Sequence, residues 1–418
     1  MYACAVNQER ESPSHVPIVI VVAASFILML WYATAKFVPF IWMFDRGIGY
    51  DAFRYHIFAQ RNAQYSLLDI LSTSDVGEFS QAGYPVLLSQ LYRLIAPDPL
   101  VGCVFNWLLW VAAGFLLVPL AKPESSPSTP LPFLTLWLLY PEAIDWSGTT
   151  SKEPLVAFAV ACGLRICSSR APRWAQMLIV GALAGLMLWV RSVVAPLVVL
   201  AFGISLEFRR ASPRSAWSRT IVLAVAAVVA LYVAGGNPAD EEETNNPLAI
   251  AGYSQMEQTY YEGLSSRSLL RRAGSPDRVM DAFYVPIRGL THLVSPLYFD
   301  PFALPFAAVA QPSGMIWLSA GVCSAATLAI LLGLIDRRLW TRNRAILFGV
   351  LVLGLMALGL SGLIHERYRS IIVAALLPLG LRSFREEAAA HGWRRLAISG
   401  AVLPVFVFLL YRILRQFS

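Results

Sequence analysis

Charged residues are scarce in this sequence. Of its 418 residues, 14% are Asp, Glu, Lys or Arg, whereas soluble domains carry about 25%. Hydrophobic residues make up 57%, and apolar runs recur from Ile18 to Leu410. A mean hydropathy of +0.59 over this length cannot come from one anchor helix. This composition excludes an ordinary soluble enzyme and predicts that the membrane is the solvent for most of the chain.

Cysteine is also rare, and its spacing is not that of a ligand set. The five cysteines are Cys4, Cys103, Cys162, Cys167 and Cys323, with no Cys-x-x-Cys pair and no Cys/His pattern. Four of them lie in apolar stretches, which favours small packing residues. No structural zinc or redox site is therefore expected, and no metal site is assigned. No cleavable signal peptide is expected either, because no small-residue cleavage site follows a short apolar run.

The apolar runs predict an all-α fold, a polytopic transmembrane bundle of about eleven spans that forms one domain over residues 1–418. The expected spans are 17–43, 100–120, 131–140, 154–168, 176–190, 193–206, 220–234, 313–334, 345–363, 371–381 and 396–411. Several are short, since fourteen residues reach about 21 Å and the hydrocarbon core is ~30 Å thick. Short spans must be tilted, kinked or packed around a water-filled cavity.

Lys and Arg are unevenly distributed between the segments that join these spans. With the N-terminus placed in the cytoplasm, the cytoplasmic segments hold 17 basic and 7 acidic residues, and the rest hold 16 and 19. This positive-inside pattern explains the net charge of +7 as topology, so no nucleic-acid partner is expected. Because the flanks of residues 176–206 are both Arg-rich, this stretch is expected to form a hairpin of two short helices that turns at Arg191 on the outer face.

Two large loops then lie on the outer, periplasmic face, at 44–99 and 235–312. The first is expected to carry amphipathic helices. The second contains the acidic run Asp240-Glu241-Glu242-Glu243 among aromatic residues and prolines. The acidic run is typical of a solvated segment, and its aromatic neighbours indicate a surface in the membrane interface.

The first outer loop begins with a polar cluster. Asp51, Tyr55 and either Arg54 or His56 would share one face of a helix that starts at Asp51. A carboxylate at the membrane surface can act as a general base toward a sugar hydroxyl. The alternative interpretation is that Asp51 caps an interfacial helix.

The tip of the hairpin after residue 140 combines helix-start signals with a cation. Thr150 and Glu153 are typical of a capping box, and Pro154 suits the first helical turn. Lys152 then stands at the positive end of a helix dipole, where an anion would be favoured. A lipid phosphate would resolve that conflict.

One further cation and one further polar cluster are expected on the outer face. Arg191 lies near membrane depth, where charge is costly and usually functional, and Arg matches phosphate oxygens bidentately. The alternative is that Arg191 reaches the membrane surface by snorkelling. The cluster His365-Glu366-Arg367-Tyr368-Arg369 lies between two apolar spans. Its two arginines are candidates for phosphate or saccharide contacts, and its glutamate for orienting one of them.

The order of these motifs is itself informative. An acidic Asp-x-x-x-Tyr-His loop is followed by Gly83-Tyr84-Pro85, which alone indicates only a turn and a helix start. A Pro…Trp-Ser…Lys-Glu hairpin, an Arg after a Gly-rich span and Glu366-Arg367-Tyr368-Arg369 come next. This series resembles the GT-C superfamily. Within it, the chain is most similar to bacterial relatives of the protein mannosyltransferase and lipid A aminoarabinose transferase group, over roughly residues 40–380.

The resemblance implies a glycosyltransferase of the bacterial inner membrane, acting in cell-envelope or exopolysaccharide biosynthesis. Its donor would be a sugar linked to a polyprenyl phosphate such as undecaprenyl phosphate, used on the periplasmic side, and its acceptor a saccharide or a lipid-linked molecule. The family's first-loop acid corresponds to Asp51, the implied catalytic base. Ala52 replaces the second acid of the family's usual Asp-Glu pair, so Asp45 is the fallback base, and the use of a divalent cation stays open.

Other site residues are expected around these two acids. The cations expected around the donor phosphate are Lys152, Arg191, Arg367 and Arg369. The residues expected to contact the substrates are Tyr55, His56, His365, Glu366 and Tyr368.

Two other classes of membrane protein stay open. A Wzy-type polysaccharide polymerase also takes an undecaprenyl-linked donor on the periplasmic face. Its Arg-x10-Gly pattern occurs from Arg278 to Gly289, but it also occurs at two other places, about as often as chance predicts. A lipid-linked saccharide transporter would place polar residues at the midplane, often with internal repeats. Here the polar clusters fall at one face and no repeat is apparent.

Overall fold

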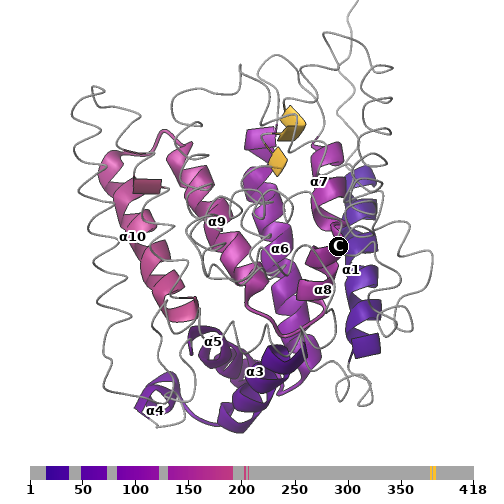
Figure 1. Ribbon diagram of the computed structural model, residues 1–418, viewed down its shortest axis with the longest axis vertical. Helices are drawn as coiled ribbons and strands as arrows, with labels where there is room; N and C mark the ends of the chain where they lie inside the picture. Colours follow the sequence, from indigo (N-terminus) through magenta and orange to yellow (C-terminus); the bar gives the residue numbers. More distant parts are fainter. Residues whose placement is uncertain are drawn as a thin grey trace, which may run out of the picture.

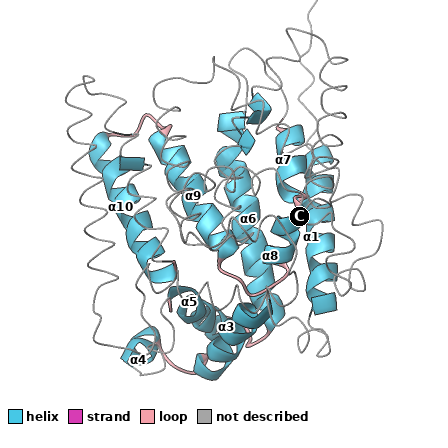
Figure 2. Cartoon of the chain, viewed as in Figure 1, coloured by secondary structure: helices cyan, strands magenta, loops and turns pink. Residues whose placement is uncertain are grey.

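The computed structural model describes residues 16–36, 49–72, 82–121 and 130–191, and the positions 202, 203, 206, 377, 378, 380, 381 and 382. Helices joined by turns and short connections make up these ranges, and no strand occurs in them (Figure 2). The expected all-α class is therefore confirmed for this part of the chain. The loop at 235–312 and nearly all of the six spans expected after Arg191 lie outside the described residues, so the count of about eleven spans stays a prediction.

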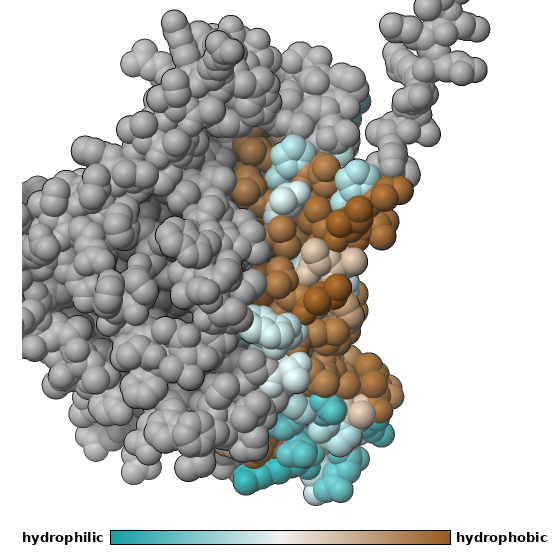
Figure 3. Space-filling view, turned by 90° about the vertical axis from the view of Figure 1, so that its right-hand side faces the viewer, coloured by the Kyte–Doolittle hydropathy of each residue, from teal (hydrophilic) through white to brown (hydrophobic). Residues whose placement is uncertain are grey.

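Three of the described helices are long and apolar enough to cross a membrane. They are α1 (Val16–Lys36), α6 (Pro99–Ala121) and α10 (Arg173–Val190). They overlap the first, second and fifth of the expected spans, and the part of the first span after Lys36 lies outside the described residues. Figure 3 shows an apolar band along the α1 side of the molecule, with hydrophilic side chains gathered at the end that carries α3 and α5. These features are those of a membrane-associated protein.

Three shorter helices lie among these spans (Figure 1). They are α7 (Leu131–Leu138), α8 (Pro141–Ser147) and α9 (Glu153–Cys167). The eight residues of α7 reach about 12 Å at ~1.5 Å per residue, so α7 cannot cross a ~30 Å hydrocarbon core alone. The expected short spans at 131–140 and 154–168 are thus helices, but α7 is broken from α8 by Pro141.

A pair of tryptophans, Trp110 of α6 and Trp137 of α7, holds the end of α7 against α6 at this break. In a continuing helix, the carbonyl of Trp137 would accept from residue 141, but Pro141 has no N–H. Trp110 Nε1 donates to the carbonyl of Trp137, and Trp137 Nε1 donates to the carbonyl of Trp110, each at 2.9 Å. The two rings stack with centroids 4.1 Å apart. Gly114 permits this approach, because a Cβ there would lie 2.6 Å from Trp137 Cδ1.

The described part of the first outer loop folds into three helices that lie across one end of the bundle (Figure 1). They are α3 (Gly49–Asn62), α4 (Leu67–Ser72) and α5 (Gly83–Leu94). α3 is amphipathic as expected, since it buries Ala52, Tyr55, Phe58 and Ala59. α5 begins at Gly83, as the Gly-Tyr-Pro motif predicts.

The end of the bundle covered by α3 and α5 also holds the turn into α9 and the end of α10 (Figure 1). The opposite end holds the arginine-rich turn from α9 to α10 and the described residues 377, 378 and 380–382, drawn in yellow. The outer-face motifs within the described ranges therefore share one end, away from Arg165, Arg170 and Arg173. This matches the expected relative sidedness, and the assignment of that end to the periplasm stays a prediction.

The chain reverses direction after Arg191. Arg191 ends α10 and pairs with Glu153, the first residue of α9. Phe202 instead lies at the other end of α9, where its ring occupies the space that a Cβ on Gly163 would need and its carbonyl lies 3.9 Å from Cys167 Sγ. The chain therefore returns along α9 between Arg191 and Phe202, as the expected hairpin requires, while the turn itself lies outside the described residues and stays a prediction.

Candidate functional site

Most of the residues that join α8 to α9 are buried, and they contact three other helices. We call residues 149–153 the central turn. Within it, Thr150, Lys152 and Glu153 are 0%, 7% and 2% exposed. Such burial of charged side chains is rare unless they are paired or functional. The contacts of each therefore define what this turn does.

The capping box expected from Thr150 and Glu153 does not form. Thr150 Oγ1 donates to the carbonyl of Ala52 in α3, at 2.5 Å. The N-cap residue of α9 is Lys152, which makes no side-chain cap hydrogen bond. Both side chains that could have closed the box are used in tertiary contacts, which override the local rule. Pro154 does stand in the first turn of α9, as expected.

Glu153 uses its carboxylate to hold the end of α10. Its Oε1 accepts a hydrogen bond from Arg191 Nη1 at 3.1 Å, and the two side chains are 3% and 7% exposed. A buried guanidinium requires such a partner, because an isolated charge in a low-dielectric interior is strongly disfavoured. Arg191 therefore does not snorkel to the surface, and that interpretation is wrong.

Lys152 points to α3 rather than along its own helix. Its Nζ lies 5.6 Å from the centroid of the Tyr55 ring, within range of a cation–π contact. The Tyr55 ring in turn packs edge-on against Tyr84 of α5, with centroids 5.7 Å apart. The first-loop helices thus supply the aromatic surroundings of the lysine amine.

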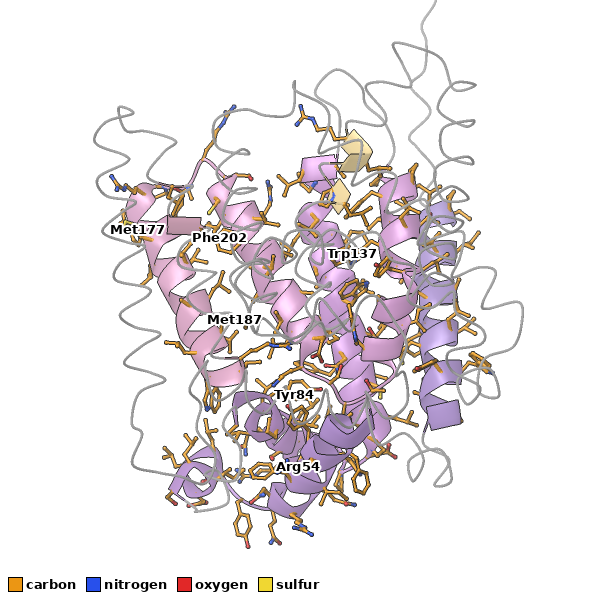
Figure 4. All side chains as sticks on the ribbon, in the orientation of Figure 1. Arg54, Tyr84, Trp137, Met177, Met187 and Phe202 are labelled. Carbon is orange, nitrogen blue, oxygen red and sulfur yellow. The ribbon has the colours of Figure 1, made fainter. Side chains whose placement is uncertain are left out.

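A buried amide of α6 fixes the backbone of the central turn. Asn106 Nδ2 donates to the carbonyls of Thr149 and Ser151, each at 2.8 Å. Asn106 Oδ1 accepts from the hydroxyl of Tyr84 at 3.0 Å. Tyr84 is fully buried, and its burial raises the pKa of its hydroxyl well above the ordinary value, so the hydroxyl keeps its proton. Figure 4 shows Tyr84 beneath the central turn.

His56 lies next to Tyr55 in sequence but has a different partner. Its Nδ1 is 2.8 Å from the hydroxyl of Tyr92 in α5, and the two rings meet edge-on. Burial lowers the pKa of His56, with the charge of Asp98 opposing this effect. His56 therefore favours the neutral imidazole and anchors α3 to α5.

Asp51 lies in the first turn of α3, one residue before Ala52, whose carbonyl accepts the bond from Thr150. α3 begins at Gly49 rather than at Asp51, so Asp51 is inside the helix and is not its cap residue. The structure therefore brings three expected elements together at the central turn: the Asp51 helix, Lys152 and Arg191. The remaining expected site residues lie outside the described ranges: Asp45, His365, Glu366, Arg367, Tyr368 and Arg369.

Three contributors to this site were not expected from the sequence as site residues. They are Glu153, Tyr84 and Asn106. Asn106 carried a usable signal, because it is the only amide or charged side chain in the apolar run of α6. Among the described residues, no group of three or more His, Cys, Asp or Glu could hold a metal ion.

We compared the chain with protein families, curated proteins and solved structures. No family model, no curated protein and no solved structure matches the chain. Arguments about function therefore depend on the residues of the chain itself.

Proposed function

We propose that this chain is a bacterial inner-membrane glycosyltransferase that takes a polyprenyl-phosphate-linked sugar at the periplasmic face. The observation that carries the proposal is the meeting at one turn of two buried cations and the first-loop helix. Lys152 and Arg191 belong to different helices and both lie beside Glu153, while α3 carries Asp51 one residue from the bond to Thr150. Cell-envelope or exopolysaccharide biosynthesis is the setting that such a donor implies.

This arrangement supports a transfer in which phosphate is the leaving group. The acceptor hydroxyl gives its proton to the Asp51 carboxylate as its oxygen bonds to the anomeric carbon of the donor sugar. The bond from that carbon to the phosphate oxygen breaks, and polyprenyl phosphate leaves with the electron pair. Lys152 and Arg191 stabilise the charge on the departing phosphate through charge-assisted hydrogen bonds.

The first experiment measures transfer by the purified full-length chain in proteoliposomes with radiolabelled polyprenyl-phosphate sugars. Asp51→Asn keeps the size of the side chain but removes the base, so transfer should fall by about 10²–10⁴-fold. Asp69→Asn is the matched control, because Asp69 is an exposed carboxylate of the same loop that bonds only locally, to Ser66. Asp45→Asn should also have a much smaller effect. Near-normal turnover by a folded Asp51→Asn protein would remove Asp51 from the mechanism.

The second experiment measures use of the donor. The expected phosphate ligands are Lys152, Arg191, Arg367 and Arg369. Replacing each of them singly by Gln should raise the KM for the donor. Unchanged donor dependence in both Arg191→Gln and Arg367→Gln would remove the phosphate clamp. Analysis of lipid-linked saccharides in a deletion strain separates the related classes, since a missing sugar supports a transferase and accumulated single repeat units support a polymerase.

A further inference from the structure

Asn106 occupies a position where an amide is costly. It lies in the membrane-spanning helix α6 and is 0% exposed. Burying an amide without partners costs several kcal/mol in an apolar medium, so its three hydrogen bonds to Thr149, Ser151 and Tyr84 are what make it tolerable there. An apolar residue would serve α6 equally well if only helix packing were required.

The face of α6 that carries Asn106 is shaped to receive the central turn. Gly102 lies one helical turn earlier on the same face. A Cβ at Gly102 would lie 2.9 Å from Thr150 Cγ2, so only glycine lets the turn approach this closely. Asn106 then bonds the carbonyls on either side of Thr150. The turn is fixed against α6 both by close contact and by two hydrogen bonds.

Lys152 is held from two directions as a result. Its backbone follows Ser151 directly, and the carbonyl of Ser151 is bonded to Asn106. Its amine lies over Tyr55, which packs on Tyr84, whose hydroxyl is also bonded to Asn106. One amide therefore sets the position of the lysine main chain and of the aromatic ring beneath the amine.

We infer that Asn106 is a positioning residue that holds the Lys152 amine where an anionic phosphate ligand binds. The inference rests on the proposed function, in which that ligand is a polyprenyl phosphate. Asn106 itself does not contact the ligand, and it acts through the central turn and the Tyr84–Tyr55 pair. Removing the Asn106 amide should therefore weaken ligand binding only through the loss of the contact that the Lys152 amine makes.

A double-mutant cycle tests this dependence. The affinity of the full-length chain for a polyprenyl monophosphate in lipid nanodiscs is measured for Asn106→Ala, Lys152→Met and the double variant. Each single change should weaken binding by about tenfold or more, since a charge-assisted hydrogen bond is lost or misplaced. The double variant should bind no more weakly than Lys152→Met alone. Multiplied effects, or wild-type affinity in either single variant, would overturn the inference.

Trp107→Phe is the matched control for simple destabilisation of α6. Trp107 is the next residue along, but its Nε1 donates to Ser25 Oγ of α1 at 3.1 Å, away from the central turn. This variant should bind the polyprenyl monophosphate as the wild type does. Weakening equal to that of Asn106→Ala would mean that any loosened α6 contact has the same effect, and it would overturn the inference.

A ligand-free measurement separates this inference from the proposed function. Lys152 is one of three lysines in the chain, with Lys36 and Lys122, so acylation of each amine can be followed by mass spectrometry. Asn106→Ala should speed acylation of Lys152 by about tenfold, because the buried amine loses its fixed position, and Trp107→Phe should not. If the wild type binds no polyprenyl phosphate, the proposed function fails. Unchanged acylation of Lys152 in Asn106→Ala is the separate result that overturns the positioning role.

Discussion

The carboxylate of Glu153, the first residue of α9, lies 3.1 Å from the guanidinium of Arg191, the residue that ends α10. The two helices are neighbours in sequence, and this buried pair closes the end of their hairpin opposite the connecting turn. Because Glu153 is also the last residue of the central turn, the pair fixes the end of α10 against that turn.

Removing one partner of this pair should destabilise the chain more than removing both partners. Glu153→Gln leaves the Arg191 charge without its carboxylate, and loss of one partner of a buried pair costs about 3–5 kcal/mol. Glu153→Gln combined with Arg191→Met removes both charges and should recover part of that loss. Thermal unfolding of the purified chain in detergent measures both. A single Glu153→Gln variant as stable as the wild type would contradict the assigned burial of the pair.

The relative sidedness of the helices can be tested with single cysteines in a chain whose native cysteines are replaced. Gln60 is exposed in α3, and Ser168 is exposed in the turn from α9 to α10. We expect Gln60→Cys to react with an impermeant thiol reagent added outside the inner membrane and Ser168→Cys to react only from the cytoplasm. Labelling of both from the same side would rule out the arrangement, and the reverse order would invert the assigned orientation.

His56 should make stability fall with acidification. Because burial lowers its pKa in the folded state, the unfolded chain binds more protons as the pH drops below the ordinary value of 6.5. The stabilising contribution is present above pH 6.5 and is lost as the pH falls from there through the lowered pKa. His56→Gln should flatten this part of the pH dependence in thermal unfolding. Tyr92→Phe should retain it, since burial is the larger cause; an unaltered slope in His56→Gln would assign the dependence to other groups.

Glycines of the spans should differ sharply in their tolerance of alanine. At Gly114 a Cβ would lie 2.6 Å from the Trp137 ring, and overpacking of this kind costs about 1–3 kcal/mol. At Gly181 no atom lies within 4 Å of the added Cβ, so Gly181→Ala should be neutral or stabilise α10 by up to about 1 kcal/mol. Unfolding midpoints of the two variants, compared with the wild type, measure the difference. Equal effects would contradict the close packing of the tryptophan pair.

Properties that depend on composition and period were predictable from the sequence. The spans now seen as α1, α6 and α10 follow from uninterrupted apolar runs, whose length is set by the membrane itself. The return of the chain between Arg191 and Phe202 was predictable from the charge distribution, because two arginine-rich flanks on the same side of the membrane require an even number of crossings between them. Both arguments use physical constraints that act on a segment regardless of what it packs against.

Contacts between distant segments were not predictable in the same way. Thr150 and Glu153 satisfy the local pattern of a capping box, yet Thr150 bonds Ala52, almost a hundred residues earlier, and Glu153 bonds Arg191. Local spacing cannot reveal a stronger partner elsewhere in the fold. The role of Asn106 was missed for the same reason, although a single amide in an apolar helix is a signal that such a partner exists.

The reciprocal bonds between Trp110 and Trp137 have a consequence for the evolution of the chain. Replacing Trp110 alone leaves the carbonyl of Trp137 without its indole donor beside Pro141, and replacing Trp137 alone leaves an empty space against Gly114. Each single step therefore passes through a defective intermediate, while a joint change avoids it. In homologues that keep the break at Pro141, the two positions should covary, and substitution at Gly114 should accompany loss of the pair.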